Sequence, residues 1–315
     1  MKVSVVLLFA IVLFAVSCGK SFDEQKEIDR AERLRLWRED SAAFKVGVLP
    51  TLDCLPMFVA QQYNLFDSAG VDIRLKYFTS NIDCDTAIVN GYLQGMVSDL
   101  VRCAKIEDKY GVVMDYPIMT KGEWYLVGNR NTRIKTLKHL DDKMVAITRH
   151  SLLDMMADKA IDSAALNPDR VYKIQVNDIN LRLMMLKNNE IDAVILPEPQ
   201  VSEATAMKNV KLAYSNEWGF DLGCVAFNKA QMADSVRGRQ LSAFMEIYDR
   251  AVDSINKHGL EYFGDLIKQQ CGVERATLDM LPDKYKLQHA TAATQEQMEK
   301  ARKWYLQKKQ NDYEF

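Results

Sequence analysis

Hydrophobic and polar positions alternate along most of the chain in the patterns of short strands and helices. In the first part, three segments have the apolar or alternating pattern of strands: Phe44–Leu49, Val71–Phe78 and Gln94–Val97. Helical spacing lies between them, over Leu55–Tyr63 and Thr86–Asn90. A strand-helix-strand repeat of this kind predicts a parallel sheet with right-handed crossovers.

The middle of the chain repeats this pattern. Strands are predicted over Met144–Thr148, Val171–Val176, Ala193–Leu196 and Lys211–Tyr214, and helices over Thr136–Asp141, Leu152–Ala165 and Asn180–Lys187. Tyr116–Asn129 is a longer extended segment, Asp221–Asn228 is a long returning strand, and the residues from Ala230 to Tyr313 are nearly all helical in pattern. A hinge between two lobes can lie only at the extended crossings around Trp124–Asn129 and Asp221–Val225.

Polar turns follow the strands of the first repeat, at Thr51–Cys54, Thr79–Asp85 and Ser98–Asp99. The carboxyl ends of parallel strands share one edge of a sheet, and ligands bind at that edge in open α/β folds. Asp83 or Asp85 is expected to cap the following helix. In the second repeat, the Pro-Glu-Pro corner at 197–199 ends a buried strand, which places Glu198 at a candidate cleft. A plain corner with an exposed glutamate is the alternative.

The N-terminus has the three parts of a secretory signal: Lys2, the apolar run Val3–Val16, and the small residues around Cys18. The sequence Ala-Val-Ser-Cys at 15–18 resembles a bacterial lipobox, which implies that Cys18 becomes a lipid-modified, palmitate-bearing N-terminus. An ordinary signal peptide is the alternative. Residues 19–43 are charged and favour helix, as expected of a tether or a helix on the domain surface.

Composition narrows the function classes. The chain has 315 residues, 48% of them hydrophobic, which is enough for two modest lobes, and its net charge of -2 provides no basic face for nucleic acid. Five further cysteines have no metal-binding spacing and are interpreted as small buried hydrophobes: Cys54, Cys84, Cys103, Cys224 and Cys271. A disulfide or thiol contact among Cys54, Cys84 and Cys103, which each follow a strand of the first repeat, is the alternative. We therefore expect neither a metal nor a cofactor.

Two segments resemble a known family: FKVGVLPTLDCLPMFVAQQYNLFDSAGVDIRLKYF, from Phe44 to Phe78, and NNEIDAVILPEPQ, from Asn188 to Gln200. Both look like the solute-binding lipoproteins of nitrate, sulfonate, taurine and thiamine-precursor ABC importers. The resemblance implies an α/β, type II periplasmic-binding-protein fold with two lobes, a hinge and a cleft between them. Residues 44–128 plus 223–315 would form lobe one, and residues 129–222 would form lobe two.

The same resemblance implies a ligand site in the turns at the strand ends and no catalytic residue. Its implied residues are Thr51, Asp53, Cys54, Thr79, Ser80, Ser98 and Asp99 in lobe one, and Thr148, His150, Ser151, Glu198, Trp218 and Asp221 in lobe two or near the return crossing. The expected partners are a small solute, the membrane permease of an ABC importer and, through the lipid anchor, a membrane. We expect a monomer in the cell envelope or periplasm.

The predicted edge is acidic, with Asp53, Asp99 and Glu198 among its side chains. Buried carboxylates without partners are costly, which favours a solute with amino donors, such as an aminopyrimidine-like compound, over a small anion. Arg149, Arg102 or the helix start at Ser151 can serve an anion instead, although each arginine is as readily a solvated surface residue. Two other functions stay open: an enzyme of the thiamine-pyrimidine or menaquinone-pathway type on this fold, and a ligand-sensing component of a signalling system.

Overall fold

The structure is a computed structural model that describes residues 22–120, 122–282 and 285–313. The chain separates into two units, Met1–Ala43 and Phe44–Phe315, which are described separately. In the first unit, helix α2 (Phe22–Ala42) confirms the helical prediction for this charged segment, and Trp37 is exposed on it. The predicted lipidation site, Cys18, lies outside the described residues.

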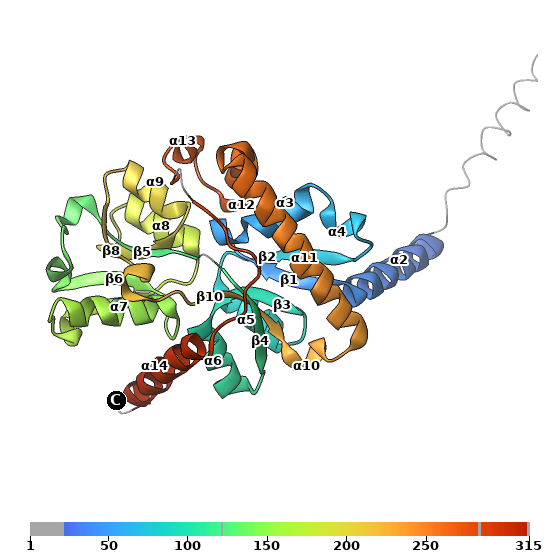
Figure 1. Cartoon of the computed structure of the whole chain (residues 1–315), viewed down its shortest axis with the longest axis horizontal. Coiled ribbons are helices and arrows are strands. Elements are labelled where there is room, and N and C mark those ends of the chain that lie inside the picture. Colours follow the sequence, from blue (N-terminus) through green and yellow to red (C-terminus); the bar gives the residue numbers. More distant parts are fainter. Residues whose placement is uncertain (1–21, 121, 283–284, 314–315) are drawn as a thin grey trace, which may run out of the picture. The chain divides into compact units, whose positions relative to one another are not determined.

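The second unit contains two five-stranded mixed sheets, which confirms the α/β, two-lobed fold class (Figure 1). In the first sheet the strand order is β2-β1-β3-β10-β4. These strands are β1 (Phe44–Val48), β2 (Ile73–Tyr77), β3 (Gly95–Asp99), β4 (Met114–Met119) and β10 (Gly223–Asn228). Strand β1 pairs in parallel with β2 and β3, whereas β10 is antiparallel to both of its neighbours. We call this sheet and its helices the first lobe.

The second sheet has the same arrangement, with the order β7-β6-β8-β5-β9. Its strands are β5 (Trp124–Gly128), β6 (Lys143–Ile147), β7 (Val171–Gln175), β8 (Ala193–Pro197) and β9 (Val210–Tyr214). Strand β6 is parallel to β7 and β8, and β5 runs antiparallel between β8 and β9. We call this sheet and its helices the second lobe.

The chain passes between the sheets twice, between β4 and β5 and between β9 and β10. The predicted extended segment Tyr116–Asn129 is therefore two strands in different sheets. The predicted boundary between the lobes lies after Gly128. Because β5 pairs with β8 and β9 of the second sheet, the chain leaves the first sheet before Trp124 instead. The division into domains otherwise stays a prediction.

Helices flank both sheets. They are α3 (Leu55–Gln62), α4 (Leu65–Ser68), α5 (Asn81–Val89), α6 (Leu100–Tyr110), α7 (Leu152–Ser163), α8 (Ile179–Lys187), α9 (Gln200–Ala206), α10 (Lys229–Met232), α11 (Ser235–His258), α12 (Gly264–Cys271), α13 (Arg275–Leu278) and α14 (Gln295–Tyr313). Single 3-10 turns lie at Leu52–Cys54, Arg130–Thr132, Leu137–Leu140, Pro168–Arg170, Ser215–Trp218 and Glu261–Phe263. The helix predicted over Thr136–Asp141 is one of these turns.

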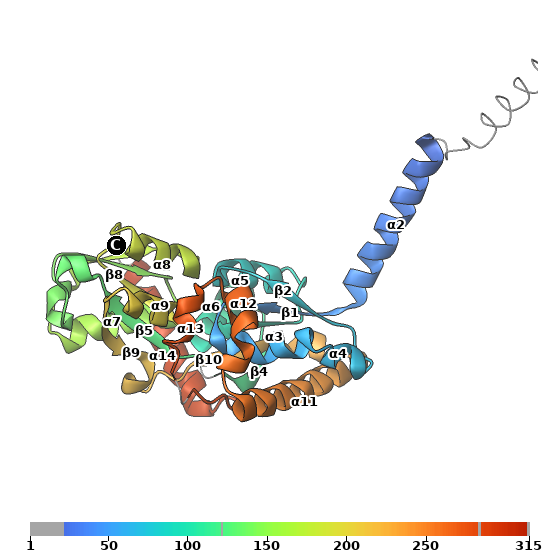
Figure 2. The same cartoon turned by 90° about the horizontal axis from the view of Figure 1, so that it is seen from above.

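An aromatic cluster holds α11 against the first sheet. The ring of Phe244 lies 6.4, 6.1 and 5.6 Å from the rings of Phe44, Phe66 and Phe227. Helix α11 also packs against α3 and α4 (Figure 2). Gly95 is required beneath this cluster, because a Cβ there would lie 2.4 Å from the Phe227 ring. This packing fixes the sheet whose strand ends carry the predicted site.

Two predicted boundaries around the site are wrong. Ser98 and Asp99 are the last residues of β3 and not a turn after it, and α6 begins at the next residue. Helix α5 begins at Asn81 and its cap is Ser80, whose Oγ accepts a hydrogen bond from the Ile82 N–H. Asp85 is therefore one turn inside α5, which leaves its carboxylate available for a different contact.

Candidate functional site

The strand-end edges of the two lobes are in direct contact. The Leu52 N–H donates a hydrogen bond to the Glu198 carbonyl oxygen (2.9 Å), and the Ile179 N–H donates to that of Thr79 (3.1 Å). Ser80 forms an isolated antiparallel bridge with Asp178. Residues after β1 and β2 thus meet residues after β7 and β8, as the sequence predicts for a site shared by two lobes.

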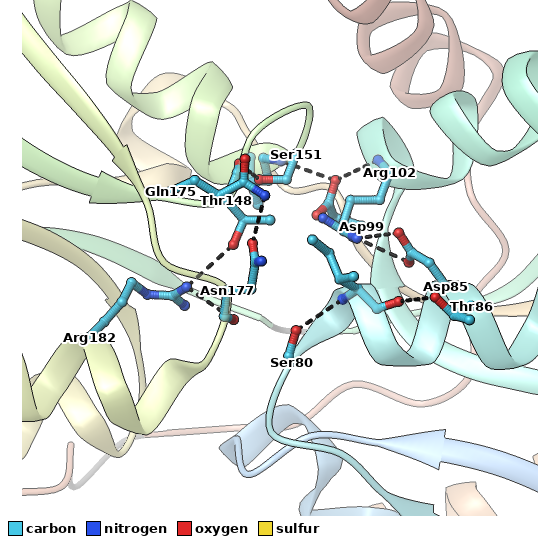
Figure 3. A network of polar contacts seen from close by, with 12 residues as sticks. Ser80, Asp85, Thr86, Asp99, Arg102, Thr148, Ser151, Gln175, Asn177 and Arg182 are labelled. Carbon is cyan, nitrogen blue, oxygen red and sulfur yellow. Dashed lines mark hydrogen bonds and ion pairs between the residues drawn. The ribbon is translucent and has the colours of Figure 1, made fainter.

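Asp99 joins the first lobe to a helix of the second (Figure 3). Its Oδ1 accepts hydrogen bonds from the N–H groups of Arg102 (3.0 Å) and Leu152 (3.1 Å). Leu152 is the first residue of α7, whose cap is Ser151, and the Ser151 Oγ accepts from the Leu153 N–H. Carboxylates are favoured at helix N-termini. The anion position predicted at Ser151 is therefore already filled by a carboxylate of this chain.

Arg102 and Asp85 form a buried ion pair in the first lobe. Two guanidinium nitrogens of Arg102 donate to the two carboxylate oxygens of Asp85. Only 1% of the Arg102 surface is exposed, so of the two alternatives for this residue the solvated surface arginine is wrong. Burial raises the pKa of Asp85, while the adjacent guanidinium opposes that rise. The pair lies next to Asp99, on the side away from Ser151 (Figure 3).

Arg182, on α8, is the corresponding buried arginine of the second lobe. It is 1% exposed and donates to the carbonyl oxygens of Val176 (2.7 Å) and Ile195 (3.0 Å) and weakly to the Thr148 Oγ1 (3.4 Å). Burial lowers its pKa to about 9, against an opposing effect of Asp178. No carboxylate of the described chain accepts a hydrogen bond from Arg182. This cation is therefore held by neutral oxygen atoms.

Asp53 is a buried anion without a cationic hydrogen-bond partner. Its Oδ2 accepts a hydrogen bond from the Thr120 Oγ1 (3.0 Å), at the end of β4. Burial raises the pKa of Asp53, and the hydroxyl groups of Thr51 and Thr120 partly offset that effect. Gly122 is beside it, because a Cβ built there would lie 3.1 Å from the Asp53 Oδ2 and 3.6 Å from the Trp124 Nε1.

Glu198 and Gln200 extend the site in the second lobe. The Ser202 N–H donates to the Glu198 Oε2 (3.2 Å), and the Lys211 Nζ lies 3.7 Å from the Oε1. Burial raises the pKa of Glu198 despite these two groups. The Gln200 side-chain amide donates across the lobes to the Pro50 carbonyl oxygen (2.7 Å). The cleft position predicted for Glu198 is thus a buried one, on the edge that faces the first lobe.

Four side-chain atoms in the described part of the chain are buried and have no hydrogen-bond partner: Ser98 Oγ, Arg102 Nη1, Glu198 Oε1 and Gln200 Oε1. All four belong to residues at or just after the ends of β3 and β8. Buried polar groups are nearly always satisfied, and unsatisfied ones often mark functional sites. This clustering is what a site that awaits a polar ligand is expected to show.

The remaining predicted residues divide into two groups. Thr51, Cys54, Ser80, Thr148 and Ser151 are buried at the meeting edges, although Cys54 only accepts hydrogen bonds from the Thr51 hydroxyl and the Leu49 N–H. The others lie away from this network: the side chains of Thr79 and Asp221 are exposed, Trp218 packs on Phe220, and His150 faces Tyr305 of α14. All five remaining cysteines are buried, as predicted, and all five are free.

Sequence reasoning missed the roles of Asp85, Arg102, Arg182 and Gln200. Arg182 sits in a helix whose pattern of apolar residues gives no sign that it faces inward. Gln200 was detectable only from its position after the Pro-Glu-Pro corner. Over the parts of the chain that the structure describes, no cluster of His, Cys, Asp or Glu fits a metal ion, and no helix is both long and apolar enough to cross a membrane.

Asp99 is expected to make stability depend on pH. Burial raises its pKa from 3.8 to about 6. Between these values the folded chain binds a proton that the unfolded chain has lost, so this group lowers the free energy of unfolding as the pH rises through the window. Asp99→Asn should remove that decrease, at most about 3 kcal/mol. Chemical unfolding of both proteins from about pH 4 to about pH 7 checks this, and equal decreases in the two would contradict it.

Comparisons with known proteins agree with this geometry. A family described as NMT1/THI5 like matches residues 51–259. A curated relative, a probable histidine-binding protein of Campylobacter jejuni, is 20% identical over 268 residues, covering 82% of this chain and 93% of its own.

Solved structures share the fold at low sequence identity. The ligand-binding component of an ABC-type import system from Staphylococcus aureus has a TM-score of 0.70 at 14% identity, covering 85% of this chain and 92% of its own. The periplasmic aliphatic sulphonate binding protein SsuA of Escherichia coli has a TM-score of 0.68 at 15% identity, covering 86% and 93%. The periplasmic nitrate-binding protein NrtA of Synechocystis PCC 6803 has a TM-score of 0.65 at 12% identity, covering 84% and 80%.

These neighbours and the curated relative are solute-binding proteins. The predicted resemblance is therefore confirmed at the level of fold and family. With about two thirds of its length matched, from the turn after β1 to the end of α11, the chain belongs to the NMT1/THI5-like family and has the periplasmic-binding-protein fold.

Proposed function

We propose that this chain is an extracytoplasmic solute-binding protein that captures a small, polar, amino-bearing solute by closure of its two lobes. The solute then passes to the membrane permease of an ABC-type importer, and a lipid on Cys18 tethers the protein to a membrane. The observation that carries this proposal is a pair of buried carboxyl groups at the meeting edges, Asp53 from the first lobe and Glu198 from the second, neither of which accepts a hydrogen bond from a cation of the described chain.

An amino group complements these carboxylates. Asp53 accepts hydrogen bonds from neutral hydroxyl groups, and the Glu198 Oε1 accepts none. A buried carboxylate without a cation is costly, and this is the case of Asp53, whereas the Lys211 Nζ lies 3.7 Å from the Glu198 Oε1 and compensates Glu198 only in part. Burial raises the pKa of both carboxyl groups. A bound ammonium or aminopyrimidine group would donate to these oxygens and remove much of that cost. Asp99 has a different function, because it already accepts from the start of α7.

Contacts across the lobes support capture by closure. Backbone and side-chain groups after β1 and β2 donate to, or accept from, groups of the second lobe. A solute enclosed there would be shielded from water on both sides, as in hinge-closing binding proteins. The solute-binding neighbours support a transport role without catalysis.

A thermal-shift screen tests this proposal. Aminopyrimidines, thiamine, polyamines, amino acids, taurine, alkanesulfonates and nitrate are added to the purified chain. A ligand at about a hundred times its dissociation constant should add about 2.7 kcal/mol of stability. Asp53→Asn or Glu198→Gln should weaken the binding of an amino-bearing compound by about 10- to 100-fold, because a hydrogen bond to a charged group is lost.

The matched control for this experiment is Asp141→Asn. Asp141 has an exposed side chain that pairs with Arg170, and it precedes β6, at the opposite end of that strand from Thr148, so this variant should bind as the parent does. A response confined to nitrate and to sulfonates without an amino group would contradict the proposal.

A further inference from the structure

Two buried arginines, one from each lobe, have a guanidinium nitrogen that donates to no group of the described chain. In the first lobe this atom is the Arg102 Nη1. In the second lobe it is the Arg182 Nη2, since the hydrogen bonds of Arg182 are made by Nε and Nη1 alone. The two charges are close enough for Arg102 to lower the pKa of Arg182. Unused donors on two buried cations, one from each lobe, are suited to a bound anionic group.

The charges near the strand ends also suggest an acidic group on the solute. Arg102 is compensated by Asp85, whereas Arg182 has no carboxylate hydrogen-bond partner. Asp53 is the opposite case, an anion with no cationic hydrogen-bond partner. An isolated buried charge is costly on either side. One ligand that carries both charges would compensate Asp53 and Arg182 together.

Trp124 connects these two groups. The Arg182 guanidinium lies 6.0 Å from the centre of the Trp124 ring. Beside the indole nitrogen, a Cβ on Gly122 would be 3.6 Å from the Trp124 Nε1 and 3.1 Å from the Asp53 Oδ2. The ring therefore lies next to both the unpaired carboxylate and the unpaired guanidinium, and its apolar surface is suited to the carbon skeleton of a small solute.

The start of α7 is not available to the acidic group. Its first two free N–H groups donate to Asp99 and to the Ser151 Oγ. Figure 3 shows Arg182 and Thr148 on one side and Arg102, Asp85 and Ser80 on the other. Arg102 and Arg182 each keep an unused guanidinium donor for the acidic group, whereas the nearby Lys211 lies against Glu198.

We infer that the solute is a small zwitterion whose ammonium group binds Asp53 and whose carboxylate or sulfonate binds Arg182 and Arg102. This inference rests on the proposed function and narrows its substrate class from amino-bearing compounds to amino acids and aminosulfonates. Trp124 packs against the carbon skeleton between the two charged ends. An amino-bearing compound without an acidic group leaves Arg182 uncompensated and is expected to bind more weakly.

Isothermal titration calorimetry of the purified chain tests the inference with three matched sets of compounds. The first contains amino acids and taurine, the second contains amino acid methyl esters and aminopyrimidines, and the third contains short carboxylates and alkanesulfonates without nitrogen. We expect the best zwitterion to bind at least about tenfold tighter than its own methyl ester. In Arg182→Gln this preference should fall to about threefold or less, with the affinity for the ester nearly unchanged.

The ratio of the two affinities separates recognition from folding, because a merely structural role of Arg182 would weaken both compounds together. Arg182→Lys is the second variant, which keeps the charge without the planar fork, and should retain part of the preference. Arg170→Gln is the matched control, since Arg170 is an exposed arginine paired with Asp141, and its ratio should equal that of the parent.

The possible results differ in whether they overturn the inference alone or the proposed function as well. Esters or aminopyrimidines that bind as tightly as zwitterions would overturn the inference and leave the proposed function in place. Binding of nitrogen-free anions alone would overturn both. If no compound of the three sets binds, the inference is overturned, and the proposed function fails for amino acids and aminopyrimidines.

Discussion

Arg102→Met is expected to lower the free energy of unfolding by about 3–5 kcal/mol, because it leaves a buried carboxylate without its partner. Asp85 is paired with Arg102, and Asp99 lies within the field of the same guanidinium. Methionine fills much of the volume of the arginine but compensates neither charge. Chemical unfolding measures the loss.

Two further variants show whether charge is the cause. Arg302→Met removes an exposed arginine that lies 3.7 Å from Glu107, and should cost less than about 1 kcal/mol. The double variant Arg102→Met with Asp85→Leu removes both charges and should recover much of the stability, since buried pairs can often be replaced by apolar residues. A loss of less than about 1 kcal/mol in the single variant would mean that the pair is open to water.

Phe244→Ala is the second large effect, with an expected loss of about 3–5 kcal/mol. Its ring is fully buried between α11 and the first sheet and touches the rings of Phe44, Phe66 and Phe227. Removing it leaves a cavity that rigid neighbours cannot fill. Because this cluster supports β1 and β10, the two strands that pair with β3, solute binding should weaken along with stability.

Val236→Ala on the same helix is the matched control. Val236 is 50% exposed near the start of α11, so its truncation should change stability by no more than about 0.5 kcal/mol. Equal losses in the two variants, measured by chemical unfolding, would contradict the description of this core.

The sequence predicted the sheets and the edge of the site because both follow from local patterns. Alternation identifies the strands, and the order of strands and helices makes them parallel. Parallel strands then bring Thr51, Asp53 and Ser80 to the edge that faces Thr148 and Glu198. These positions depend on where strands end, which proline and polar residues mark clearly.

The sequence could not predict which groups the buried charged side chains contact. Asp85 and Arg102 meet because two helices, α5 and α6, pack side by side, and no spacing in the sequence encodes that contact. Arg182 has an exposed neighbour, Leu181, and a buried one, Leu183, so its own burial depends on how α8 is rotated against β8. His150 illustrates the converse, since its position at a helix start suggested the site, yet its ring faces Tyr305 of α14.

A crystal structure with the strongest compound from the thermal-shift screen would test the central claim most directly. We predict the solute between the two lobes, with its amino group within hydrogen-bond distance of the Asp53 carboxylate and its acidic group within that distance of Arg182. A solute bound to one lobe alone, or in the cavity lined by Lys105, Arg149 and Tyr305, would contradict it.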